Sequence, residues 1–396
     1  MTHDASILPA SSARTVARTA PGVPLVIKLA ARNLFHDRLR FVATIIGIVF
    51  SIVLVAVQLG LFLGFERMVT TMIDHAPADL WVVSRGTKCF EDPSLFSTQN
   101  RARALSVAGV EQAVPLIVGF AEWSVPDGGV TPVFLIGSDR GGLEPWNVKA
   151  GNVDALSEPH AVAVDRTYFT RLGMHGIGDS TTIRDDKVVV RAVTQGIRSF
   201  TTTPYIFTPL DRAKTYIGAS QSEISYLLIH AAKGANVGTI RSQLLKKLVK
   251  VEVLTPNAFR DRSRDFWLFG TGAGAALFGG ALLGAIVGTV IVAQTLYSST
   301  KDHLTEFATL RAIGSSSFYI HKVILIQALL NAVIGFAIAA LIDLLIVLLT
   351  ANTALPVVTT PLLLVVLFVL TVVMCVASAI SAIVQVTRID PVRVFK

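Results

Sequence analysis

The sequence predicts a polytopic α-helical membrane protein with four transmembrane helices and a large α+β extracytoplasmic domain between helices 1 and 2. Hydrophobic residues make up 52% of the 396 residues and charged residues only 16%, which lies outside the range of soluble globular proteins. Four apolar segments are long enough to cross a hydrocarbon core, which needs about 20 helical residues. These segments are Phe41–Phe65, Leu268–Tyr297, Val323–Thr350 and Pro361–Val386.

The distribution of charge predicts the topology. The net charge is +8, and the excess of Lys and Arg lies in residues 1–40, 298–322 and 387–396, beside the apolar segments. Residues 66–265 are nearly neutral, with 23 basic and 21 acidic residues. Because short cytoplasmic segments are rich in Lys and Arg, we expect both termini and residues 298–322 in the cytoplasm, and residues 66–265 and 351–360 outside. A nucleic-acid partner is not expected, since no dense basic face is present.

The first 65 residues contain a cytoplasmic tail and the first transmembrane helix. From Pro24 to residue 40 we expect an amphipathic elbow helix that lies along the membrane surface, with a frayed basic tail as the alternative. A secretory signal is not expected, because about 40 polar or amphipathic residues come before the first apolar run; a transit peptide is an alternative from composition. Gln58 lies inside the span, where a hydrogen bond to a neighbouring helix or to its own backbone is expected.

Residues 66–265 alternate between strand and helix patterns. The two cysteines, Cys89 and Cys375, lie in the outer domain and in the fourth span, so they cannot pair. The eight histidines show no metal-ligand spacing, and we expect no metal or other cofactor. Strands are predicted over Leu80–Ser84, Val110–Val125, Val130–Ser138, Lys187–Val193, Tyr205–Phe207, Ser225–His230 and Val251–Leu254. Helices are predicted over Arg101–Ala108, Ala163–Leu172, Asp211–Tyr216 and Val237–Leu248.

Residues 259–265 are highly charged and run directly into the second apolar segment, residues 266–297. We therefore expect a continuous helix that leaves the membrane as a stalk. This helix is rich in glycine at four-residue spacing, which allows helices to approach closely in lipid. The spacing predicts a packing seam within the bundle or between two copies, although glycine is common in membrane helices generally. The seam residues are Gly270, Gly274, Gly280, Gly284 and Gly288.

The third apolar segment, residues 323–350, contains one acid, Asp343. It lies ~20 residues from the cytoplasmic end, or ~30 Å along the helix, near the outer face. We interpret it as an interfacial acid that reaches water or headgroups, with a proton relay as the alternative. Residues 351–360 form a short outer loop, and the fourth span, residues 361–386, is followed by a cytoplasmic tail at 387–396.

The polar segment Ser298–Lys322 lies between two membrane-length apolar runs. Asp302 is a good helix-capping residue and Gly314 a good C-terminal stop, so a helix of about three turns is predicted between them. Apolar and charged side chains on this helix suit docking to another protein better than simple reversal of the chain. The docking residues predicted are Asp302, His303, Leu304, Glu306, Phe307, Leu310, Arg311 and Gly314.

The sequence lacks the motifs of self-contained catalysis. It has no Gly-Lys dipeptide, which excludes a P-loop ATPase, and no H-E-x-x-H or G-x-S-x-G motif. Four spans without a polar cluster also fit a secondary transporter poorly. We therefore expect a non-catalytic protein that another protein moves or that senses a ligand.

The segment DHLTEFATLRAIGSSSFYI, at residues 302–320, resembles the cytoplasmic turn of FtsX/MacB-type ABC permeases, and is most similar to the DevC-like branch. Other similar stretches are QLG at residues 58–60, DLWVVS at 79–84, VEQAVPLIVGFAEW at 110–123 and RIDPVRVF at 388–395. The resemblance covers essentially the whole chain in order: one span, an outer domain and three spans.

The resemblance implies a mechanotransmitting permease of the bacterial inner membrane. Its expected partners are a separate ABC ATPase subunit, a second permease copy that makes a homodimer, a HlyD-type membrane-fusion protein and a TolC-like outer-membrane protein. The expected cargo is a lipid, a glycolipid or another hydrophobic molecule. The alternative is an FtsX-like regulator whose outer domain controls a cell-wall hydrolase or senses a ligand.

Overall fold

The computed structural model describes residues 38–302 and 317–387, together with Ala30, Leu34 and Thr309. The elbow helix expected from Pro24 lies almost entirely outside the described residues. The chain divides into two compact units. The larger unit comprises residues 48–288 and 335–371, and the smaller unit comprises residues 1–47, 289–334 and 372–396.

Four long apolar helices are candidate membrane spans, which confirms the predicted number. They are α2 (Arg38–His75), α8 (Ala273–Asp302), α10 (Ser317–Thr350) and α11 (Pro361–Thr387). The first helix continues ten residues beyond the predicted end at Phe65. It does so because an amphipathic stripe follows the apolar run, and four residues of that stripe are buried: Met68, Val69, Met72 and Ile73.

The outer domain is built on a ten-stranded sheet. Its strands are β1 (Leu80–Ser84), β3 (Val110–Ser124), β4 (Val130–Ser138), β5 (Val148–Gly151), β6 (Ala161–Asp165), β7 (Ser180–Ile183), β8 (Asp186–Thr194), β9 (Tyr205–Thr208), β11 (Tyr226–Ala231) and β12 (Val251–Leu254). The order is β12-β1-β11-β3-β4-β9-β6-β8-β5, and β7 pairs with β3 and β8. A separate pair joins β2 (Phe96–Ser97) to β10 (Glu223–Ile224).

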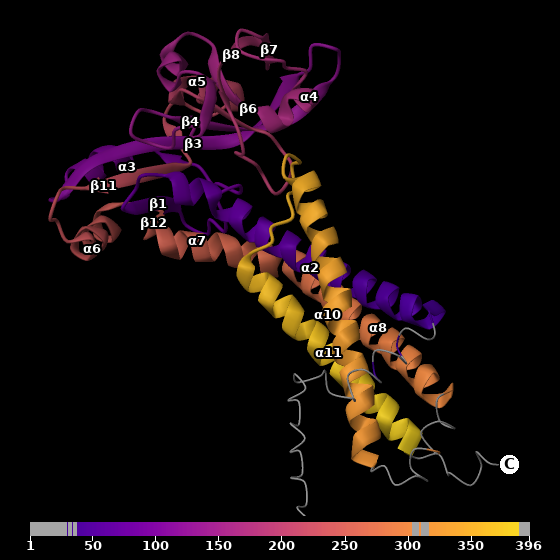
Figure 1. The fold of residues 1–396 in the computed structure, drawn as a ribbon. Coiled ribbons are helices and arrows are strands. Elements are labelled where there is room, and N and C mark those ends of the chain that lie inside the picture. The colour runs from indigo at the N-terminus through magenta and orange to yellow at the C-terminus, as the bar shows by residue number, and fades with distance from the viewer. Residues whose placement is uncertain (1–29, 31–33, 35–37, 303–308, 310–316, 388–396) are drawn as a thin grey trace, which may run out of the picture. The chain divides into compact units, whose positions relative to one another are not determined.

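The long strand β3 belongs to both halves of this domain (Figure 1). Its first part, to Leu116, pairs with β11, and its remainder pairs with β4 as far as Ser124. One half holds β11, β1 and β12 with α3 (Gln99–Leu105) and α6 (Val237–Lys247). The other half holds β4, β9, β6 and β8 with α4 (Phe169–Leu172) and α5 (Leu210–Ile217). Each half has its own apolar core, so the α+β domain consists of two halves that share one strand.

A third core, which we call the junction core, joins the sheet to the two helices that enter the domain. Met72 and Ile73 supply it from the end of α2, and Phe259 supplies it from α7 (Pro256–Asp265). The Phe259 ring is fully buried, with its centroid 5.2 Å from Trp81 and 5.7 Å from Tyr226. Both connections between the domain and the apolar helices therefore end in one packed core.

The helix predicted over Ala163–Leu172 is wrong in its first half. Ala161–Asp165 forms β6, Arg166–Tyr168 forms a 3-10 turn (η2), and only Phe169–Leu172 is α-helical. All five β6 residues are buried, so the strand shows no alternation of polar and apolar residues, and a short Ala/Val run is compatible with either structure. The Asp165 side chain accepts a hydrogen bond from the Thr167 backbone N–H and caps the turn.

The continuous stalk helix expected through residues 259–297 is interrupted. After α7, residues Phe266–Gly270 form a π-helix, η3, and α8 begins only at Ala273. Between them Gly272 has a φ of +78°, in the left-handed region that glycine occupies without steric cost. Short π-helical turns are typical of functional sites in helices, and this one lies where the stalk meets the apolar helix.

Candidate functional site

Most of the predicted docking segment lies outside the described residues. This applies to His303, Leu304, Glu306, Phe307, Leu310, Arg311 and Gly314, so their role stays a prediction. Asp302, which we expected to begin the docking helix, is instead helical within α8. Its carboxylate forms a salt bridge with Arg40 of α2, and Arg40 Nη1 also donates to the Ser298 carbonyl O at 3.5 Å. Within the smaller unit, the start of α2 is thus tied to the end of α8.

Two of the predicted seam glycines face α2 within the larger unit. A Cβ atom at Gly280 would lie 2.8 Å from Gln58 Nε2, and one at Gly284 would lie 3.1 Å from Leu54 Cδ2. Ser51 Oγ donates to the Gly284 carbonyl O at 2.5 Å. The missing side chains therefore allow α2 and α8 of one chain to approach closely. Gly288, one turn further along α8, is also buried.

The other two predicted seam glycines do not share a helix. Gly270 ends the π-helix, and Gly274 lies at the start of α8, beyond the left-handed residue. A Cβ at Gly274 would lie 2.5 Å from the Leu268 carbonyl O, so this glycine faces the chain's own preceding turn. Gly270 and Gly274 therefore lie on either side of the break in the stalk and, among the described residues, do not form a packing seam with another helix.

The loop between α10 and α11, residues 351–360, packs against α2 and the outer domain; we call it the strap. Val358 N donates to the Gly60 carbonyl O at 3.1 Å, and a Cβ at Gly64 would lie 2.5 Å from the Pro356 carbonyl O. At its other end, Arg198 Nη2 of the outer domain donates to the Ala351 carbonyl O at 2.7 Å. The sequence predicts only a short outer loop here, and the signal for its packing is the Gly60-x-x-x-Gly64 spacing in the first span.

The strap also contacts Asp343 of α10. The Asp343 side chain is only 2% exposed, so it does not reach water or headgroups as the sequence suggested. Thr359 Oγ1, in the strap, donates to Asp343 Oδ2 at 2.9 Å, whereas Asp343 Oδ1 has no hydrogen-bond partner among the described residues. The expectation that this acid reaches water is wrong because the strap residue Thr359 binds it.

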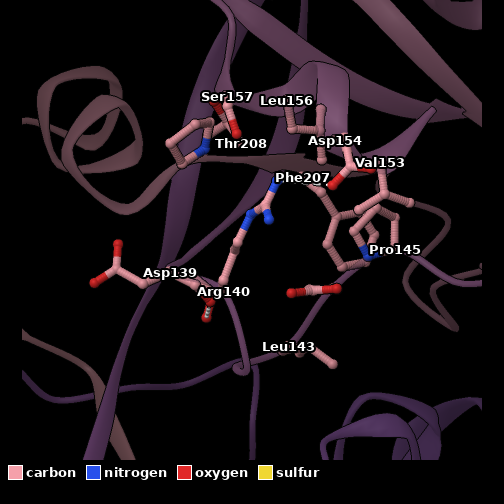
Figure 2. A pocket seen from close by; sticks show the side chains of 13 residues that line it. Asp139, Arg140, Leu143, Pro145, Val153, Asp154, Leu156, Ser157, Phe207 and Thr208 are labelled. Atoms are coloured by element: carbon pink, nitrogen blue, oxygen red, sulfur yellow. Dashed lines mark hydrogen bonds and ion pairs between the residues drawn. The ribbon is translucent and has the colours of Figure 1, made fainter. Parts of the chain in front are cut away.

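The outer domain contains a pocket of about 440 Å³, which the sequence did not indicate. Figure 2 shows Arg140 extending across it to Asp154, with which it forms a 2.7 Å ion pair. Asp139 and Glu144 add two carboxylates to the lining, so acids outnumber the one cation. Burial, followed by repulsion from Asp211, raises the pKa of Asp139 above its ordinary value.

The wall of this pocket contacts the end of α2. Phe207 of β9 lines the pocket and packs edge-on against Trp146, with ring centroids 6.0 Å apart. Trp146 in turn stacks on His75, the last residue of α2, at 3.9 Å. The pocket and the first apolar helix are thus linked through two aromatic contacts.

Comparison with known proteins agrees with this architecture of four apolar helices and an inserted α+β domain. Residues 41–247 match the model of the MacB-like periplasmic core domain, and residues 278–391 match the model of the FtsX-like permease C-terminal. The chain belongs to the FtsX/MacB-type permeases of ABC transporters. A comparison with curated proteins finds no match.

Three solved structures are similar to about half of this chain. The periplasmic region of MacB from Actinobacillus actinomycetemcomitans has 10% identity and a TM-score of 0.36, covering 48% of this chain and 94% of that one. The extracellular domain of the ABC-type transporter YknZ from Gram-positive bacteria has 13% identity and a TM-score of 0.34, covering 45% and 99%. A permease domain from Porphyromonas gingivalis has 13% identity and a TM-score of 0.31, covering 47% and 91%.

Membership of this family defines the general role of the chain. It is a multi-pass inner-membrane protein with a periplasmic domain, and it is the permease component of an ABC transporter. The ATPase of such a transporter is a separate subunit, which is therefore a partner of this chain.

Proposed function

We propose that this permease is a mechanotransmitter of an export system, which transmits ATPase closure to its periplasmic domain. In this proposal it acts as a homodimer of the DevC-like branch, with a HlyD-type adaptor and a TolC-like outer-membrane duct. Its cargo is a lipid, a glycolipid or another hydrophobic molecule. Both termini and residues 298–322 face the cytoplasm.

The observation that carries the proposal is the attachment of both entering helices to the junction core. Beyond the Phe259 ring contacts, Arg260 Nη2 of α7 forms a 2.6 Å ion pair with Asp74 at the end of α2. Arg262 Nη2 forms a 2.8 Å ion pair with Glu252 of β12. A displacement of the stalk therefore acts on packed side chains of the sheet, because close-packed interiors transmit strain.

The location of the pocket supports handling of cargo outside the membrane. It lies in the outer domain, and its wall touches the end of α2 through Trp146 and His75. A displacement of α2 would therefore change the position of the pocket wall.

The docking assignment is tested by co-purification with the ATPase subunit. We expect Phe307→Glu and Glu306→Lys to reduce recovery of the ATPase about tenfold or more, because each places the wrong charge in a protein interface. Phe120→Glu and Glu122→Lys are matched controls, since both residues are exposed on β3 of the outer domain. Unchanged recovery with the first pair would remove residues 298–322 as the docking element.

The cargo and the regulator alternative are separated by a deletion strain. Export of a lipid predicts that its envelope lipid profile changes and that a wild-type copy restores it. An unchanged lipid profile together with altered cell-wall hydrolysis would instead establish the FtsX-like regulator, in which the outer domain controls a hydrolase.

A further inference from the structure

Glu91 is a buried acid at the point where the stalk meets the outer domain. It follows β1 in the chain and is 8% exposed. Tyr205 Oη, from β9, donates to Glu91 Oε1 at 2.9 Å. Trp267 Nε1, from the π-helix η3, donates to Glu91 Oε2 at 3.1 Å. One carboxyl group thus holds a sheet strand and the irregular turn of the stalk together.

The same turn is fixed on its other side by aromatic packing. The Trp267 ring lies with its centroid 4.2 Å from that of Phe200, and Phe200 packs edge-on against Phe65 of α2 at 4.9 Å. Met68 and Val69 of α2 complete this small apolar cluster. A change in the contacts of Trp267 therefore affects both the stalk, which contains this residue, and α2, which packs against it through Phe200.

The site is poorly suited to a charged carboxylate. An ionised carboxylate has about four acceptor positions, and Glu91 receives two neutral side-chain donors. No Lys, Arg or His among the described residues forms an ion pair with it. Burial therefore raises the pKa of Glu91 from 4.5 to about 7, against the lowering effect of the hydrogen bonds from Tyr205, Trp267 and its own backbone N–H.

The neighbouring thiol and phenol groups have pKa values well above this range. On the same segment, burial raises the pKa of the Cys89 thiol to about 12. Burial also places the pKa values of Tyr205 on β9 and Tyr226 on β11 well above 10. The charged neighbours contact other groups. The Lys88 Nζ lies 5.6 Å from the centroid of the Phe266 ring. Arg262 of α7 forms an ion pair with Glu252, and this contact lowers the pKa of Glu252. The next residue in the chain, Asp92, is also acidic, so it cannot balance the charge of an ionised Glu91.

We propose that Glu91 is a proton-binding site that controls how firmly the π-helical turn of the stalk is held on the outer domain. When protonated, Glu91 Oε1–H donates to the Tyr205 oxygen while Oε2 still accepts from Trp267, and no buried charge remains. When the proton leaves to solvent, the carboxylate keeps the Tyr205, Trp267 and backbone N–H donors, but these three do not fill its roughly four acceptor positions and no cation among the described residues balances its charge. Water then enters the contact between Trp267 and Phe200, because an under-bonded buried charge demands solvation.

The direction of the pH effect follows from the raised pKa. The stabilising contribution of Glu91 is complete below its ordinary value near 4.5 and is lost as the pH rises through about 7. The stalk is therefore held more firmly in an acidic periplasm than in a basic one. This inference goes beyond the permease assignment, because it names the proton as a ligand and requires neither the ATPase nor the cargo.

The test uses the full-length protein in lipid nanodiscs. An infrared pH titration should show a protonated-carboxyl C=O band that disappears with a midpoint near 7, and Glu91→Gln should remove it. In parallel, the Trp267 fluorescence is obtained as the difference between wild type and Trp267→Phe. This signal should become more accessible to a collisional quencher with the same midpoint. In Glu91→Gln it should not change with pH.

Two further variants keep the test decisive. Tyr205→Phe removes one donor to the carboxylate and should raise the midpoint by about one pH unit. Glu122→Gln, which removes an exposed carboxyl on β3, should leave the midpoint unchanged. A band that survives Glu91→Gln, a midpoint near 4.5, or a Trp267 signal that does not follow the titration would overturn the proposal. If Glu91→Gln does not fold, the shift or constancy of the midpoint in Tyr205→Phe gives the answer.

Discussion

Gly64 shows how a single missing side chain places the strap against α2. The position that its Cβ would occupy lies 2.5 Å from the Pro356 carbonyl O, and a backbone atom cannot move aside as the tip of a side chain can. We expect Gly64→Ala to cost about 1–3 kcal/mol, the usual range for overpacking, and to lower the unfolding temperature of the purified protein in detergent.

A matched substitution is available on α8. Gly279 has no atom within 4 Å of a built Cβ, so Gly279→Ala adds the same methyl group without a clash. We expect it to be neutral or to stabilise by up to about 1 kcal/mol, because alanine favours helix over glycine. Equal effects of the two substitutions would show that the strap does not depend on close approach at Gly64.

The same residues show where sequence reasoning stops. The glycine spacing on α8 predicted close helix packing, and Gly280 and Gly284 do lie against α2. The spacing of Gly60 and Gly64 carried an equal signal, but their partner is the backbone of a loop almost 300 residues away, which no local pattern specifies. Asp343 is bound by Thr359 of the same strap, so its distance along the helix alone gave the wrong environment.

Among the secondary-structure elements, the break at Gly272 separates the stalk from the apolar helix α8. Because its φ of +78° strains any residue with a Cβ, we expect Gly272→Ala to destabilise the protein by about 1–2 kcal/mol. Gly272→Asn should be milder, since asparagine adopts the left-handed conformation more readily. The measurement is the unfolding temperature of both variants, and a gain in stability with alanine would mean that the stalk prefers an unbroken helix.

Elements were predictable where their pattern was local. The predicted bounds of β4 and β12 agree with the structure, and long apolar runs indicated the four helices. The prediction failed at β6, whose residues are buried on both faces, and at the stalk, where the apolar run continues through a left-handed glycine. Both features depend on the tertiary structure around the segment, which the local sequence does not specify.

At the scale of the whole molecule, the proposed mechanotransmitter needs a connection from the ATPase to the periplasmic domain, and both entering helices end in the junction core. Phe259 is the stalk residue most deeply placed in it, fully buried against Trp81 and Tyr226. Removing this ring should cost about 3–5 kcal/mol locally, the usual range for Phe→Ala in a core. It should detach α7 while leaving residues 298–322 unchanged.

This leads to a prediction about transmission. With Phe259→Ala, the ATPase subunit should still co-purify, but nucleotide should no longer change the rate at which trypsin cuts the arginines of α7. These arginines, at positions 260, 262 and 264, are partly buried in ion pairs, so cleavage reports how well the stalk is held. Phe120→Ala removes an exposed ring from β3 and should preserve the nucleotide effect. If nucleotide still altered cleavage after the stalk was released, force would have to reach the periplasmic domain through α2 and the strap instead.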